Sequence, residues 1–341
     1  MKLDLPPEVF SWLSDNKEVR DLLIQHGATI PRFSPEHEGW NDYRTQYSNL
    51  PLLGATKPAE QAYCHWLTAH KYRGDGKIVD LGCWLGSLSI PLARGLAENP
   101  RLAGKTIERI HSYDLFIWDR IMIDWVKHTK LAGRLADGDC YMDVYKEILG
   151  PLLDQFEVHK ADLTTEKWTG GPIEILIVDA MKNLDLVRNI SREFFPHVPK
   201  AGWVLHQDFL WFGDPWIYLL MYRLRDYFSV AYAVPGTSSV NFQCKKVVKP
   251  ENIELPENLN GFSEAEISDA AAWACEFAPP EGRAMIRAGK GLILAYQGSN
   301  SAKGILEDAL VDPDISADAL KELKWWLKLS EIAHKQGLSC A

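Results

Sequence analysis

The sequence lacks the paired cysteines of a disulfide-stapled or zinc-binding domain. Its six cysteines form no CxxC pair and have no His/Cys spacing suited to zinc; they are Cys64, Cys83, Cys140, Cys244, Cys275 and Cys340. We therefore expect reduced thiols, as in a cytoplasmic protein.

Basic clusters and long apolar runs are also missing. The formal net charge is −9, and no stretch gathers the Lys and Arg that neutralise phosphates, which argues against nucleic acid as a partner. The first residues carry acids and prolines in place of the basic and apolar regions of a signal peptide. The most apolar helical stretch, Trp216 to Leu224, is far shorter than the roughly 20 residues that cross a bilayer. We expect a cytoplasmic protein with no membrane partner.

What the chain does contain is an ordinary globular composition, with 46% hydrophobic and 24% charged residues. A length of 341 residues is long for one core, so a domain of about 200 residues with added segments is expected. The pattern divides the chain into an N-terminal helical cap (1–56), an α/β domain (57–247), a Pro- and Asn-rich linker (248–262) and a C-terminal helical region (263–341).

Between residues 77 and 247, short apolar runs alternate with helical patterns, which predicts an α/β fold with a Rossmann-like, seven-stranded, mostly parallel sheet. Two β-like runs close this region after a helical stretch, and they indicate an antiparallel last strand inserted at the sheet edge. The expected strands are 77–81, 109–114, 156–161, 174–179, 202–208, 229–234 and 238–244. The expected helices are 8–25, 58–70, 87–96, 215–227, 263–277, 280–297, 302–310 and 316–336.

Acidic residues stand at or near the ends of five predicted strands: Asp80, Asp114, Asp162, Asp179 and Asp208. In an open parallel sheet, ligands bind outside the carboxyl ends of the strands. A single acid there could merely cap the following helix. Five such acids indicate a ligand site.

The loop after the first strand contains Gly82 and Gly86, which allow a tight turn and a close approach of backbone to a ligand. Their GxxxG spacing departs from the GxGxxG that binds a pyrophosphate. A nucleoside without phosphates fits this loop better.

The stretch from Asp80 to Ser89 resembles motif I of class I S-adenosylmethionine-dependent methyltransferases, in the D-x-G-x-x-x-G-x-x-S form of the macrocin O-methyltransferase branch. The resemblance spans about residues 57–245 and implies S-adenosyl-L-methionine as cofactor. It places Gly82 and Gly86 with Asp80 around the methionine part, and Asp114 on the two ribose hydroxyls, since a carboxylate accepts two hydrogen bonds at once. Asp162 would meet the adenine amino group. Further expected cofactor contacts are Cys83, Trp84, Ser87, Leu115 and Leu163.

A competing hypothesis is a nicotinamide-dependent enzyme that uses Asp114 on its ribose. The third glycine of the phosphate loop is missing, which argues against it.

The run from Asp179 to Lys182 resembles the strand-end motif of catechol-type O-methyltransferases, in which the Asp binds magnesium and the Lys is the base. Asp208 matches the second metal-binding Asp of that family. Phe209 departs from the Asn or Asp that completes the metal site there. Two carboxylates could still hold Mg²⁺, but more weakly.

Without a metal, the same residues could act as general acid and base. His206 and Asp208 alternate along one predicted strand and should face the same side, and His titrates near neutrality. A His within a strand can instead be a core residue. Lys182 could be a solvated side chain, and it becomes a base only if its pKa is depressed.

The sequence thus predicts a methyltransferase that acts on a hydroxyl of a sugar or small natural product, by in-line transfer with base or metal assistance. Aromatic residues after Asp208 (Trp211, Phe212, Trp216) should pass over the acceptor. The alternatives are N- or C-methylation, and a non-catalytic cofactor-binding regulator or scaffold that uses its C-terminal helices. The N-terminal helix could supply a homodimer contact.

Overall fold

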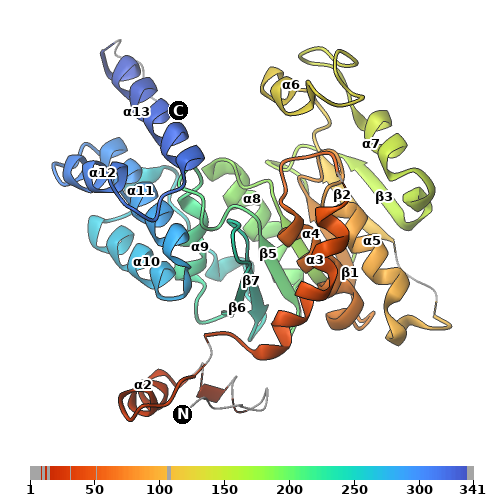
Figure 1. Cartoon of the computed structure of the whole chain (residues 1–341), viewed down its shortest axis with the longest axis horizontal. Coiled ribbons are helices and arrows are strands. Elements are labelled where there is room, and N and C mark those ends of the chain that lie inside the picture. Colours follow the sequence, from red (N-terminus) through yellow and green to blue (C-terminus); the bar gives the residue numbers. More distant parts are fainter. Residues whose placement is uncertain are drawn as a thin grey trace.

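The computed structural model describes residues 9, 12–13, 16–30, 32–50, 52–105 and 109–335. A seven-stranded sheet in the order β3-β2-β1-β4-β5-β7-β6 crosses the centre of the molecule (Figure 1). The strands are β1 (Lys77–Leu81), β2 (Ile110–Asp114), β3 (Phe156–Lys160), β4 (Ile173–Val178), β5 (Trp203–His206), β6 (Phe228–Ala233) and β7 (Val240–Cys244). β1 to β5 are parallel, and β7 lies antiparallel between β5 and β6. The predicted fold class is confirmed, with every strand end within two residues of its expected position.

The central strand β4 is buried over its whole length, as expected for a parallel strand with helices on both faces. Its side chains alternate between two hydrophobic cores: Ile175 and Ile177 enter one, and Leu176 and Val178 enter the other. The one charged residue, Glu174, accepts hydrogen bonds from backbone N–H groups of residues 73 and 75, both at 2.7 Å. This pairing satisfies a fully buried carboxylate.

Helices cover both faces of the sheet. On one face lie α4 (Pro58–Trp66), α5 (Ser89–Glu98) and α7 (Met142–Leu149), and on the other α8 (Leu184–Glu193) and α9 (Trp216–Arg223). The predicted helix over 58–70 is α4 continued by a π-helical turn, Leu67–Lys71. Four described α-helices lie outside the predicted set: α3 (Asn41–Ser48), α6 (Arg120–Val126), α7 and α8. α3 packs against α4, so tertiary contact stabilises a segment whose own sequence reads as loop.

The predicted C-terminal helices are α10 (Glu264–Phe277), α11 (Pro280–Tyr296), α12 (Ala302–Leu310) and α13 (Ala317–Lys335). They lie together on the left in Figure 1. α10 joins the core of the sheet through Ile267 and Ala270. α11 to α13 form a smaller core around Phe212, with Met285 and Leu323. The C-terminal region is therefore packed directly on the loop that follows β5.

The N-terminal segment contacts the body of the molecule at α10 and β6, among other places. Of the helix predicted over 8–25, the structure shows α2 (Lys17–Gln25); several of the preceding residues lie outside the described part. Arg32 donates hydrogen bonds of 2.9 Å to the carbonyls of three residues, 276, 277 and 278, at the end of α10. Trp40 Nε1 donates to the hydroxyl of Tyr232 on β6 at 2.9 Å. These contacts carry the chain toward the carboxyl end of the sheet.

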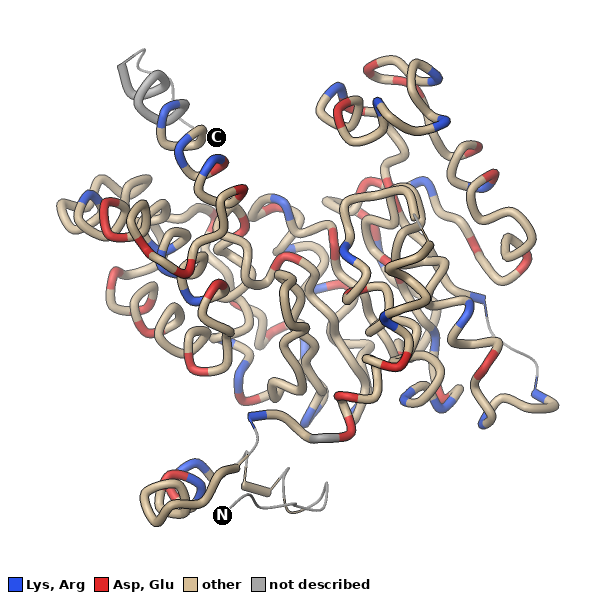
Figure 2. The backbone as a smooth tube through the Cα atoms, viewed as in Figure 1, with Lys and Arg blue, Asp and Glu red and all other residues tan. Residues whose placement is uncertain are grey.

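The described surface mixes both charge signs. Figure 2 shows Lys and Arg dispersed among Asp and Glu along the described backbone. The five cysteines within the described residues are free thiols. None of the helices in this part of the chain combines the length and apolar character that a membrane span requires.

Candidate active site

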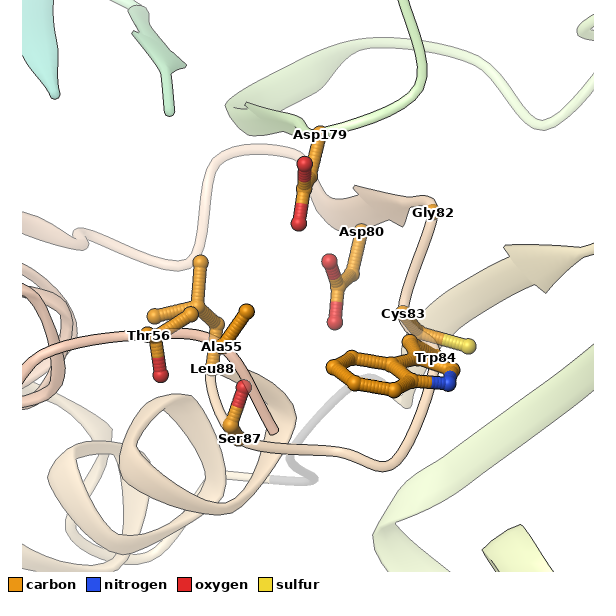
Figure 3. Close-up of a pocket in the computed structure, with 9 residues that line it drawn as sticks. All are labelled: Ala55, Thr56, Asp80, Gly82, Cys83, Trp84, Ser87, Leu88 and Asp179. Atoms are coloured by element: carbon orange, nitrogen blue, oxygen red, sulfur yellow. The ribbon is translucent and has the colours of Figure 1, made fainter. Parts of the chain in front are cut away.

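A pocket lies outside the carboxyl ends of the neighbouring strands β1 and β4. This is the point in the sheet where the strand order changes direction: β2 and β3 lie on one side of β1, and β4 and β5 lie on the other. Figure 3 shows the residues that line it: Ala55, Thr56, Asp80, Gly82, Cys83, Trp84, Ser87, Leu88 and Asp179. Five of the predicted cofactor residues and one predicted catalytic residue are therefore brought together. Among the described residues, the lining contains two carboxylates and neither Lys nor Arg.

The loop from β1 to α5 depends on its glycines. Gly82 has φ +85°, and a Cβ atom at this position would lie 2.7 Å from the carbonyl oxygen of Asp179. Only glycine allows both the conformation and this approach of two loops. Gly86, with φ +80°, closes the turn by donating its N–H to the carbonyl of Cys83 at 2.8 Å.

Asp114, at the end of β2, is held by three donors. The backbone N–H of Trp84 donates to Oδ2 at 3.0 Å, and that of Phe116 to Oδ1 at 2.9 Å. The Tyr141 hydroxyl donates to Oδ1 at 2.7 Å. Trp84 and Phe116 are non-glycine residues with positive φ, 39° and 53°. Such strain costs on the order of 1–3 kcal/mol per residue and concentrates at functional sites.

Asp80 lies beneath this loop and is buried. It accepts a hydrogen bond of 2.6 Å from the hydroxyl of Ser89. Burial raises the pKa of Asp80 to about 6; the Ser89 hydrogen bond opposes this shift and the charge of Asp114 adds to it. The carboxyl group therefore changes charge near neutral pH.

A second cluster of charged residues adjoins the pocket. Lys182 Nζ lies 2.9 Å from Asp179 Oδ1, in direct contact with Asp208, and 3.9 Å from Asp214 Oδ2. Burial lowers the pKa of Lys182, but the three carboxylates outweigh it and raise the pKa well above its ordinary value. Lys182 is therefore a cation at neutral pH, and the condition for its predicted role as a base, a depressed pKa, is not met.

The predicted magnesium ligands, Asp179 and Asp208, do lie together, but the ammonium group of Lys182 occupies the space between them. Phe209, at the position of the missing third ligand, is fully buried and packs on Phe242 at a ring distance of 5.1 Å. Magnesium needs about six oxygens at about 2.0–2.1 Å. These residues do not fit a divalent ion while Lys182 is in place.

His206 is not at the site, so its predicted role as a base is not supported. β5 ends at His206, and the alternation that was expected to align it with Asp208 stops there. Its ring is fully buried near Phe195 and Phe242, and burial lowers its pKa to about 3. Neither ring nitrogen has a hydrogen-bond partner among the described residues.

Three further predicted cofactor residues lie away from the pocket lining. Asp162 is exposed beyond β3 and accepts hydrogen bonds from the backbone and hydroxyl of Thr164, at 2.9 and 2.7 Å. Leu163 is buried in the hydrophobic core. Leu115 is 48% exposed next to Asp114, where an apolar ligand could cover it.

The aromatic residues after Asp208 serve mainly the fold. Phe212 is fully buried in the C-terminal core, and Trp216 Nε1 donates to the carbonyl of Met181 at 2.5 Å. Trp211 is half-buried, and its ring packs on Phe212 at a centroid distance of 4.5 Å.

Sequence reasoning missed three polar residues beside the cluster. The side-chain nitrogen of Gln207 faces Asp179 Oδ1 at 3.0 Å. Burial raises the pKa of Asp214 to about 7, with Asp208 adding to the shift. Glu60, buried on α4, accepts a hydrogen bond of 2.7 Å from the Ser239 hydroxyl, and burial raises its pKa to about 7. Of these three, only Asp214 could have been suspected from the sequence, because it follows Asp208 by six residues on the same predicted loop.

The pocket is nearly closed. Its cavity is about 10 Å³, room for roughly one water molecule. The backbone before Thr56 packs tightly on the loop, since a Cβ at Gly54 would lie 2.6 Å from Ser87 Oγ. The Nε1 atom of Trp84 is buried without a hydrogen-bond partner among the described residues. The cavity in this form is too small for a nucleoside, and the segment 52–57 and the Trp84 indole border it.

No protein-family model matches the sequence, and no curated protein matches it. Among solved structures, the O-methyltransferase NovP superposes with a TM-score of 0.44 at 15% identity, over 60% of this chain and 88% of that one. The calicheamicin methyltransferase CalS11 gives 0.42 at 15% identity, over 62% and 93%. An O-methyltransferase from Bacillus cereus, in complex with SAH, gives 0.35 at 15% identity, over 70% and 97%. By the strand order and direction of its own sheet, the chain has the Rossmann-like fold of class I methyltransferases.

Proposed function

We propose that this protein is an S-adenosylmethionine-dependent methyltransferase that acts on a hydroxyl group of a sugar or small natural product. One observation carries the proposal: Asp114 is held by three donors beside a glycine loop whose pocket contains two carboxylates and no basic residue. A dinucleotide pyrophosphate would find no positive charge in this lining. A nucleoside that carries a sulfonium and an ammonium group would find two carboxyl groups, those of Asp80 and Asp179.

The cofactor would lie across the β1–α5 loop. Oδ1 of Asp114 already accepts two hydrogen bonds and Oδ2 accepts one, so Oδ2 keeps a lone pair for one ribose hydroxyl. The second ribose hydroxyl would take the place of the Tyr141 hydroxyl on Oδ1. The exposed Leu115 side chain offers an apolar surface next to the ribose site for the adenine. Asp80 and Asp179 lie in the lining at the methionine end. The contact of Asp162 with the adenine amino group stays a prediction.

The acceptor would bind beside Lys182, where Asp208 and Asp214 lie. The positive charge of Lys182 favours ionisation of a nearby hydroxyl, and Asp214, with its pKa near 7, is suited to receive the proton. The acceptor oxygen then forms a bond to the methyl carbon as the bond from carbon to sulfur breaks, and S-adenosylhomocysteine leaves. In this scheme most of the rate enhancement comes from holding the acceptor oxygen in line with the methyl group of the cofactor.

The test has two steps. Calorimetry with S-adenosylhomocysteine should show binding at one site, and methyl-labelled S-adenosylmethionine should then transfer label to a member of a panel of sugars and phenolic natural products. No binding of S-adenosylhomocysteine at millimolar concentration would overturn the proposal.

A second candidate is a non-catalytic regulator whose segment 52–57, which borders the pocket, moves when the cofactor binds. Binding without transfer to oxygen, nitrogen or carbon acceptors would support this regulator and contradict the enzyme.

A further inference from the structure

Away from the pocket, three side chains capable of binding a metal meet on the edge of the sheet. His111 Nδ1 lies 3.1 Å from His159 Nε2 and 3.9 Å from Glu157 Oε2. His159 Nε2 lies 3.6 Å from Glu157 Oε1. The sequence showed no zinc-like spacing here because the two histidines are 48 residues apart and meet only through strand pairing.

The strand register explains the arrangement. His111 on β2 pairs with Glu157 on β3, the edge strand at the right in Figure 1. Glu157 and His159 are two residues apart on one strand and share a face, so the three side chains form a triangle. His111 lies three residues before Asp114, about 10 Å along the strand. The triangle is thus distinct from the proposed ribose site at Asp114.

Ring packing holds the two imidazoles in place. His159 stacks on Tyr113 at a centroid distance of 4.2 Å, and His111 meets the Trp168 ring edge-on at 5.1 Å. Burial lowers the pKa of His159, and the nearby Glu157 and Glu166 only partly oppose this shift. A neutral imidazole is the form that binds a metal.

We propose that His111, Glu157 and His159 bind a divalent first-row transition metal ion of the Zn²⁺ class. Ligands at about 2.0–2.1 Å from a tetrahedral ion lie about 3.3–3.4 Å from one another, and the three separations here bracket that value. Two nitrogens and one carboxylate are a donor set for zinc, and magnesium would prefer oxygens alone. Glu157 is 50% and His159 26% exposed, so an ion can enter from solvent and keep a water as its fourth ligand.

The bound ion would join the edge strand β3 to β2, the strand that carries Asp114. The proposal does not depend on methyl transfer, because its test uses metal binding alone.

The experiment titrates the chelator-treated full-length protein with ZnCl₂ by calorimetry and follows thermal unfolding. We expect one ion per chain with a dissociation constant of micromolar or below, and an unfolding temperature that rises with zinc concentration. MgCl₂ at the same concentrations should leave the unfolding temperature unchanged. Cobalt bound at this site should give a visible spectrum without thiolate-to-metal charge transfer, since the triangle contains no cysteine.

The exposed ligands are varied first because the buried His111 could be needed for folding. Glu157→Gln and His159→Ala should each weaken zinc binding at least 10-fold, while circular dichroism shows an unchanged fold. The matched controls are His128→Ala, an exposed histidine on another segment, and Cys140→Ser, the exposed thiol; both should bind zinc like the parent protein. Zinc binding that survives His159→Ala, or is lost in Cys140→Ser, would overturn the proposal, as would no binding at 100 µM zinc.

Discussion

The ammonium group of Lys182 lies 2.9 Å from the carboxylate of Asp179, in the place where a two-aspartate site would hold a divalent ion. A side chain that carries one positive charge can balance neighbouring carboxylates as a metal does, but it leaves no open coordination position. The cation of this site is thus part of the chain.

Replacing Lys182 should therefore change the metal preference of the protein. In Lys182→Met, three carboxylates lose their shared cation, and Mn²⁺ should now bind there, visible as loss of the free-ion signal in electron paramagnetic resonance. The parent protein should bind Mn²⁺ at least 10-fold more weakly at this site. Lys249→Met, a surface lysine on the linker, is the matched control. Equal Mn²⁺ binding by parent and variant would show that Lys182 does not occupy a metal position.

Asp114 should dominate cofactor affinity. Asp114→Asn loses a charge-assisted acceptor for two ribose hydroxyls, each hydrogen bond being worth about 1.5–3 kcal/mol. Calorimetry should show S-adenosylhomocysteine binding weakened about 100-fold or more. Asp162→Asn tests the predicted adenine contact. It should weaken S-adenosylhomocysteine binding less than Asp114→Asn does, because Asp162 is exposed. If Asp114→Asn bound the ligand as tightly as the parent, the ribose site would have to lie elsewhere.

Asp80 should make stability depend on pH. Its carboxyl pKa rises from an ordinary 3.8 to about 6 in the folded protein, so the folded state binds the proton more tightly than the unfolded state. The resulting free-energy cost of folding is absent below pH about 4, grows up to pH about 6 and then stays constant, at about 3 kcal/mol at most. Asp80→Asn removes it. Thermal unfolding should show the variant more stable than the parent at pH 8 and similar to it at pH 4, and a difference independent of pH would contradict this assignment.

Gly82 should be intolerant of any side chain. In Gly82→Ala, the strain of a positive φ is joined by a clash with the carbonyl of Asp179, which must shift and pull the two loops apart. Gly104→Ala is the matched control, with φ +74° and no atom within 4 Å of the added Cβ. We expect Gly104→Ala to cost about 1 kcal/mol of unfolding free energy and Gly82→Ala at least 2 kcal/mol more. Equal costs in chemical denaturation would show that the loops relax without penalty.

The pattern of short apolar runs determined the strands and the direction of the sheet. Parallel strands buried on both faces need nearly continuous apolar residues, so the sequence of β4 could be recognised locally. Gly82, Asp114 and Asp179 could also be recognised as site residues from the sequence. Each stands at the carboxyl end of a predicted strand, and the carboxyl ends of parallel strands lie at the same edge of the sheet.

What only the tertiary structure decided is the environment of each side chain. His206 sits at the end of a strand like the acids, yet it is buried among the rings of Phe195, Phe209 and Phe242. Lys182 is a cation because three carboxylates from the loops after β4 and β5 surround it. His111 meets His159 only through pairing of β2 with β3. Local residue patterns determine which segments form helices, strands and turns, because they reflect backbone preferences and hydrophobic periodicity. Charge state and ligand geometry depend instead on distances between residues far apart in the chain, which exist only once the sheet is assembled.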